Sequence, residues 1–174
     1  MKRLFSKKIT VFILALITFF LAGYAYRLIR FDNFNKLNTD SNKQVSSNEN
    51  LPLDAKIISP QGVNISVMVA DTEKEWELGL SYFSSLSDHQ GMLFVFPQVG
   101  TYRFWMKDMN FPIDIVWIDE MFQIIGRNDN ISPQSFPKTF TPPGPVRYVI
   151  ELPANSALRD GFLIGNKILL QYDK

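Results

Sequence analysis

Residues 91–96 read Gly-Met-Leu-Phe-Val-Phe, and residues 113–118 read Ile-Asp-Ile-Val-Trp-Ile. Both stretches are short, almost wholly apolar, and rich in β-branched or aromatic side chains, which is typical of buried β-strands. Asp119-Glu120 follows the second stretch and leads into another apolar segment at 122–126, which predicts a β-hairpin. The central part of the chain is therefore expected to be a β-sheet.

The residues before these strands predict two further strands and a helix. Strands are expected at 56–59 and 64–70, on either side of a turn at Pro60-Gln61-Gly62. Thr72 and Glu75 then have the spacing of a capping box, and a short helix is expected over 73–82. Its apolar face would contain Trp76, Leu80 and Phe83.

The residues after position 100 contain further strand signals and one long proline-rich segment. Strands are expected at 102–106, 147–152 and 167–172, with a helical turn at 154–159. Residues 128–145 contain five prolines and are expected to form an irregular loop. About eight short strands and one helix predict a single mainly β domain, either a β-sandwich or barrel-like.

The first fifty residues have a different composition. Lys2, Arg3, Lys7 and Lys8 precede an uncharged apolar run at 9–26, so residues 1–30 are expected to form a cytoplasmic stub and a transmembrane signal anchor. The domain would then lie outside the cytoplasm. The alternative is a secreted protein, released by signal-peptide cleavage near Ala25. Residues 31–50 are polar and are expected to be a disordered linker to the β-rich domain at 51–174.

Charge and cysteine content exclude several classes of function. Residues 1–50 carry 8 Lys and Arg against 3 Asp and Glu, whereas residues 51–174 carry 10 against 14. A mildly acidic domain lacks the basic surface that binds phosphate backbones, so we expect no nucleic-acid partner. The chain has no cysteine, which excludes disulfides, a cysteine nucleophile and a lipoprotein anchor.

Several motifs in order resemble the family called domain of unknown function 192, over about residues 56–172. The resemblance implies a small, jelly-roll-like domain, often behind a signal or anchor segment, and no established activity. The chain departs from the family pattern at Asp108-Met109, where Asn-Thr is usual, and at Asn166, where Asp is common. The motifs that carry the resemblance are Val69-Ala70-Asp71-Thr72, Gly79-Leu80, residues 91–96, Phe104-Trp105-Met106-Lys107, Pro112-Ile113-Asp114-Ile115, residues 147–153, Gly161 and residues 164–168.

The most suggestive polar residues lie around the turn between 102–106 and 113–118. We expect Trp105, Lys107 and Asp114 to meet near one cleft, with Asp71 and Asp108 as further candidates for ligand binding. Asp114 stands inside an apolar strand and needs a partner, which Lys107 could provide. The alternative interpretation is structural: Trp105 packs in the core and Lys107 forms an ion pair with Asp114.

Other catalytic or metal-binding arrangements are weakly supported. His89 is the only histidine, and nearby Ser84, Ser85 and Ser87 lack a nucleophile-elbow sequence. Met92, Met106 and Met109 could in principle bind a soft metal, but methionine more often fills cores. We therefore expect no metal site and no cofactor.

Two functional hypotheses remain. The first is a membrane-anchored binding or accessory module of the cell envelope, with an envelope ligand or protein as partner. The second is a hydrolase acting on envelope material, using Asp114 with Lys107 or Asp71. An open cleft with converging polar groups would favour chemistry, and a closed ion pair under aromatic rings would favour a structural role.

Overall fold

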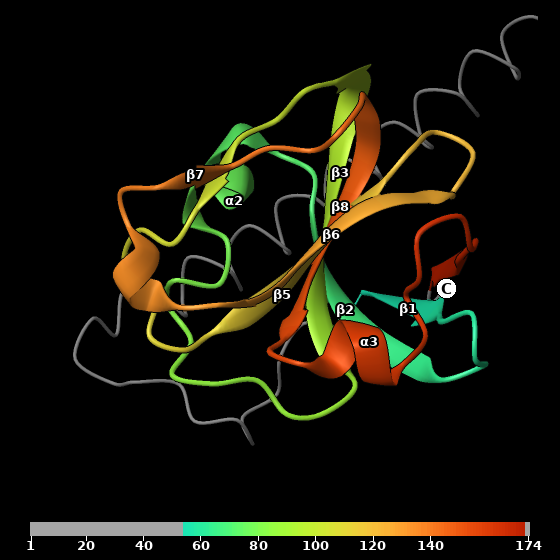
Figure 1. Ribbon diagram of the computed structural model, residues 1–174, viewed down its shortest axis with the longest axis horizontal. Coiled ribbons are helices and arrows are strands. Elements are labelled where there is room, and N and C mark those ends of the chain that lie inside the picture. The colour runs from blue at the N-terminus through green and yellow to red at the C-terminus, as the bar shows by residue number, and fades with distance from the viewer. Residues whose placement is uncertain (1–53, 173–174) are drawn as a thin grey trace, which may run out of the picture. The chain divides into compact units, whose positions relative to one another are not determined.

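The computed structural model describes residues 54–172, which form a mainly β domain with few helices (Figure 1). The mainly β class predicted from the sequence is confirmed. The predicted signal anchor at 1–30 and linker at 31–50 lie outside the described residues. Within residues 54–172, no helix has the length and apolar character needed to cross a membrane.

Most strands belong to one mixed sheet of seven strands rather than to two comparable sheets. Its order across the sheet is β6 (Ile124–Ile131), β5 (Ile113–Ile118), β8 (Val146–Pro153), β3 (Gln90–Gly100), β2 (Asn64–Ala70), β1 (Ala55–Ile58) and β9 (Leu169–Tyr172). Two short strands, β4 (Phe104–Trp105) and β7 (Thr139–Phe140), pair separately. The helices are α2 (Glu73–Leu78), the 3-10 turn η1 (Pro133–Ser135) and α3 (Ser156–Arg159).

Strands β2 and β3 are parallel, whereas a jelly roll is built from antiparallel strands. Parallel neighbours need a crossover connection, and residues 71–89, which contain α2, provide it. The other strand pairs of the sheet are antiparallel, including the predicted hairpin of β5 and β6. The helix was expected; the parallel pairing of β2 and β3 across it is what distinguishes this topology from a jelly roll.

The two outer strands of the sheet approach each other at one end. The amide of Ile124 in β6 donates to Asn166, and the amide of Ile168, just before β9, donates to Phe122. Gln123 and Lys167 also form an isolated bridge. These bonds connect the sheet edges and give the domain a partly closed, barrel-like form.

The two faces of the sheet carry different buried side chains. Glu151 of β8 lies opposite Met92 of β3 and Ile115 of β5, so these three side chains share one face. Asp114 pairs with Leu152 and lies on the other face. That second face packs into the main apolar core with α3 and the C-terminal segment; its members include Val67, Leu93, Val116, Ile150, Leu152, Ala157, Phe162 and Ile168.

Helix α2 has the predicted start and an earlier end. Thr72 and Glu75 form the capping box in both directions. The helix stops at Leu78 rather than near residue 82, because Gly79 adopts a positive φ of 49° and ends the helical hydrogen bonding. Leu80 and Phe83 are still buried, but from the turns that follow rather than from a helical face.

The proline-rich segment is more ordered than expected. Strand β6 continues to Ile131, η1 follows, and β7 pairs with β4. Of the strand predicted at 102–106, only Phe104 and Trp105 form a ladder, because β7 pairs with these two residues alone. In Figure 1, α2 and β7 lie on one side of the long strands β3 and β8, and β1 and the C-terminus lie on the other.

Candidate ligand-binding pocket

A pocket of about 320 Å³ opens between α2, the sheet face that carries Glu151, and the segment that joins β3 to β5. Its size is at the lower end of the range typical of small-molecule sites. Apolar and aromatic side chains supply most of the wall, and a few charged groups lie among them. The lining includes Trp76, Gly79, Phe96, Tyr102, Trp105 and Glu151.

Glu151 is the buried polar group of this pocket. Its side chain is only 4% exposed, and its Oε2 atom has no hydrogen-bond partner among the described residues. Burial raises the pKa of Glu151 to about 8, because an apolar setting disfavours the carboxylate. Gly79 borders the carboxyl group: a Cβ atom at that position would lie 3.7 Å from Oε2.

Aromatic rings that contact one another form a wall of the same pocket. Phe96 and Tyr102 stack with centroids 3.5 Å apart, and Trp76 lies 5.2 Å from Phe96. Phe104 packs edge-on against Phe94 at 4.9 Å. Trp76 donates its indole N–H to the carbonyl of Ala70, so this ring is fixed in orientation. The wall is therefore preorganised rather than assembled from mobile side chains.

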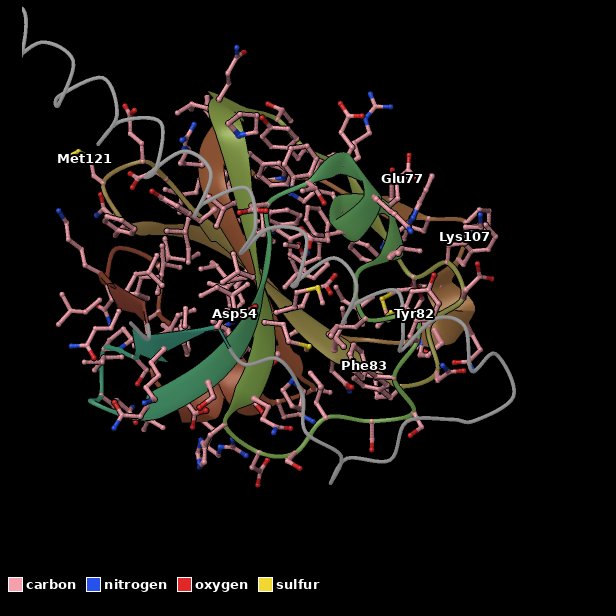
Figure 2. All side chains as sticks on the ribbon, turned by 180° about the vertical axis from the view of Figure 1, so that it is seen from behind. Asp54, Glu77, Tyr82, Phe83, Lys107 and Met121 are labelled. Carbon is pink, nitrogen blue, oxygen red and sulfur yellow. The ribbon has the colours of Figure 1, made fainter. Side chains whose placement is uncertain are left out.

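The mouth of the pocket carries charges of both signs. Glu73 and Glu77 come from α2, whereas Arg103 and Lys107 come from the segment between β3 and β5. All four are exposed. Figure 2 shows Glu77 and Lys107 on the same side of the domain, and Met121 on the opposite side.

Trp105 and Lys107, two of the predicted site residues, line this pocket. Trp105 is 52% exposed, so it is not a core residue and its ring is accessible from solvent. The structural interpretation of Trp105 as core packing is therefore wrong. Met106, between them, is buried, so side chains 105–107 alternate between solvent and the interior.

Asp114 is held away from the pocket, on the opposite face of the sheet. Its Oδ1 accepts the amides of Asn130 at 2.7 Å and Asn155 at 3.0 Å, and its Oδ2 accepts the amide of Ala157 at 2.9 Å. Within residues 54–172, no ion pair joins Asp114 to Lys107. The partners of this buried carboxylate are thus backbone amides, not the predicted lysine.

The remaining candidates are scattered. Asp71 precedes α2 and donates its amide to Glu75, and Asp108 is exposed in a turn with a φ of 59°. His89 lies 3.7 Å from the carboxylate of Asp160. Met109 lines the pocket, whereas Met92 is buried in the core. No group of three His, Asp or Glu side chains in the described part of the chain could hold a metal ion.

Sequence reasoning did not select Glu151, although a signal was present. Glu151 interrupts the apolar run of 148–152, just as Asp114 interrupts 113–118. A charged residue inside a buried strand requires either a partner or a function. Applied to both strands, the same test would have identified both carboxylates, but not which one faces a pocket.

Comparison with known proteins gives one family and solved structures of similar fold. No curated protein matches the chain. A protein from Sinorhizobium meliloti 1021, for which a role as a transcription regulator has been suggested, is 27% identical, with a TM-score of 0.62 over 73% of this chain and 97% of its own. A protein of unknown function from Novosphingobium aromaticivorans is 24% identical, also with a TM-score of 0.62, over 67% of this chain and 83% of its own. The second likeness concerns the fold alone.

The family model described as an uncharacterized ACR matches residues 56–170. The match covers almost all of the described domain, including α2, β8 and the pocket between them. It agrees with the resemblance found in the sequence motifs. The chain therefore belongs to the family of domain of unknown function 192.

Proposed function

We propose that the chain is a membrane-anchored binding module whose extracytoplasmic domain takes a small ligand into the pocket beside α2. The anchor rests on the basic, then apolar, N-terminal sequence, and the binding role rests on the pocket. The observation that carries the proposal is the buried Glu151 oxygen without a partner in an aromatic cavity. An uncompensated buried polar atom costs about 1–3 kcal/mol, which a bound ligand could recover.

A hydrolase that uses Asp114 with Lys107 or Asp71 is the less favoured alternative. Both oxygens of Asp114 already accept backbone amides, so this carboxylate is not placed to act as a base. Among the described residues, the pocket lining contains one buried carboxyl group and no serine, threonine or histidine. Binding therefore accounts for the arrangement with fewer assumptions than catalysis.

The test uses the full-length protein and a panel of small amines, alcohols, carboxylic acids and amides. Thermal unfolding and tryptophan fluorescence are measured with each compound, on wild type and on Trp105→Ala. We expect at least one compound class to raise the melting temperature, and Trp105→Ala to weaken its binding about tenfold or more, since the exposed ring lines the pocket.

Met121→Ala is the matched control, because Met121 is also an exposed apolar side chain and lies on the other side of the domain (Figure 2). This variant should bind like wild type. The proposal fails if no compound stabilises the protein, or if Trp105→Ala and Met121→Ala affect binding equally.

A further inference from the structure

We propose that the ligand of this pocket carries a protonated amine, which lies against the Glu151 carboxylate and beneath the rings of the aromatic wall. This inference rests on the binding function proposed above and adds the chemical class of the ligand. It comes from three features of the pocket: the acceptor at its base, the rings around it and the charges at its mouth.

The acceptor is the first feature. Glu151 Oε2 is buried without a partner among the described residues, and Gly79 leaves the space beside it free of a side chain. A carboxylate accepts hydrogen bonds only, so the complementary group is a donor. A donor that also carries positive charge makes a shorter and stronger bond than a neutral donor.

The rings are the second feature. The aromatic side chains that line the pocket include Trp76, Phe96, Tyr102, Phe104 and Trp105. The face of an aromatic ring attracts a cation, by about 2 kcal/mol or more where water is excluded. The same rings would also pack against the apolar body that bears the amine. A neutral apolar ligand would gain the packing but would leave Glu151 without a donor.

The charges around Glu151 are the third feature. From α2, Glu73 and Glu77 line the mouth, while the Glu75 carboxylate accepts the amides of Asp71 and Thr72 at the helix start. The flanking strands offer Glu151 only Met92 and Ile115 on its own face.

Of the described residues, Arg103 and Lys107 are the two cations that line the pocket, and Tyr102 precedes them in the chain. Both cationic side chains are exposed, and no ion pair within residues 54–172 ties either of them to Glu151. The position next to Glu151 Oε2 is therefore open to an outside cation.

The protonation of Glu151 determines the direction in which the affinity for an amine changes with pH. Burial raises the pKa of Glu151 to about 8, so at neutral pH the empty pocket mostly holds the neutral acid. When an ammonium group binds, Glu151 releases its proton to solvent and the ion pair forms. Affinity for an amine should therefore rise with pH, by up to about tenfold per pH unit below the pKa of Glu151, and level off above it.

A ligand that accepts a hydrogen bond from neutral Glu151 would show the opposite trend. Its affinity would be constant at low pH and would fall as Glu151 ionises. The direction of the pH dependence thus separates a cationic ligand from a neutral acceptor, without knowledge of the natural ligand.

The experiment compares benzylamine with benzyl alcohol, and cyclohexylamine with cyclohexanol, on the full-length protein. Each pair has nearly the same shape and differs in charge. Calorimetric titrations are run between about pH 6 and pH 8.5, in buffers with different ionisation enthalpies, so that proton release is counted directly. At the highest pH, we expect the amines to bind at least about tenfold more tightly than the alcohols.

Two variants assign the effect to one group. Glu151→Gln should remove most of the preference for amines, together with the proton release. Glu120→Gln changes an exposed carboxylate in the turn between β5 and β6, outside the pocket lining, and should retain both. If Glu151→Gln does not fold, the pH dependence and proton release of wild type still decide the question.

The outcomes for the inference and for the proposed function are distinct. Alcohols that bind as tightly as amines, with binding sensitive to Trp105→Ala, would overturn the cationic ligand but leave the binding function standing. Amine affinity that does not rise with pH would also overturn it. If neither class binds, or if Trp105→Ala has no effect on what binds, the pocket as a binding site fails as well.

Discussion

Replacement of Glu151 by glutamine should stabilise the domain, and the gain should depend on pH. The folded state keeps this buried carboxyl group protonated up to a pKa of about 8, whereas an exposed glutamate has a pKa of 4.5. Between these values the folded state binds more protons than the unfolded state. Stability is therefore highest below the unfolded pKa and is lost as pH rises through 4.5 toward 8.

The magnitude follows from the two pKa values. A pH of 7 lies two and a half units above the pKa of Glu151 in the unfolded chain. Each of these pH units lowers the free energy of unfolding of wild type by about 1.36 kcal/mol. The total is about 3 kcal/mol, which a neutral glutamine in the same place avoids. At pH 4.5 the gain should shrink below about 0.5 kcal/mol, since Glu151 is then neutral in the folded state and only half ionised in the unfolded state.

Thermal and urea unfolding of the full-length protein at a series of pH values measures this difference. A gain of about 3 kcal/mol corresponds to a rise in melting temperature on the order of 10 °C for a domain of this size. Glu77→Gln, at an exposed carboxylate of the same pocket, should stay within about 0.5 kcal/mol at every pH. A Glu151→Gln variant that is destabilised at pH 7, or a difference that does not change with pH, would refute the reasoning.

Three further predictions concern the rest of the chain. Asp114→Ala should lower the free energy of unfolding by urea by about 3 kcal/mol or more, because it removes the acceptor of three amides. Lys107→Ala should lower it by less than about 0.5 kcal/mol. Equal losses would contradict the conclusion that backbone amides, and not Lys107, are the partners of Asp114. Residues 51–174 alone should fold, as judged by circular dichroism; an unfolded spectrum would show that the preceding residues are needed. A reporter active only in the cytoplasm, fused after Lys174, should remain silent, and N-terminal sequencing that starts at Tyr26 would indicate signal-peptide cleavage.

Local signals in the sequence predicted local structure well. The capping box of Thr72 and Glu75, and the bounds of β2 and β5, agree with the structure because each depends on residues close together in the chain. The parallel pairing of β2 and β3 could not be read in this way. Strand partners are separated by α2 and its turns, and hydrophobic periodicity does not encode which strands become neighbours.

At the candidate site too, the sequence predicted local features but not the contacts between distant residues. Alternation correctly gave Asp114 the face opposite to Ile113 and Ile115, and it correctly indicated a buried carboxylate in need of partners. It could not show that Lys107 follows β4 on the far side of the sheet. Glu151 interrupts an apolar run in the same way, but the pocket beside it could not be predicted, since α2 and residues 102–109, which form it, are distant in sequence.

The clamp formed by Asp114 has a consequence for how the domain opens. One side chain holds the amides of Asn130, Asn155 and Ala157, which belong to the end of β6 and the start of α3. Any fluctuation that withdraws this carboxylate exposes all three amides to solvent together. Their exchange with deuterium should therefore follow a single opening event, in which the open end of the β5–β6 hairpin, away from its turn, and the α3 turn behave as one cooperative unit rather than as two segments that fray independently.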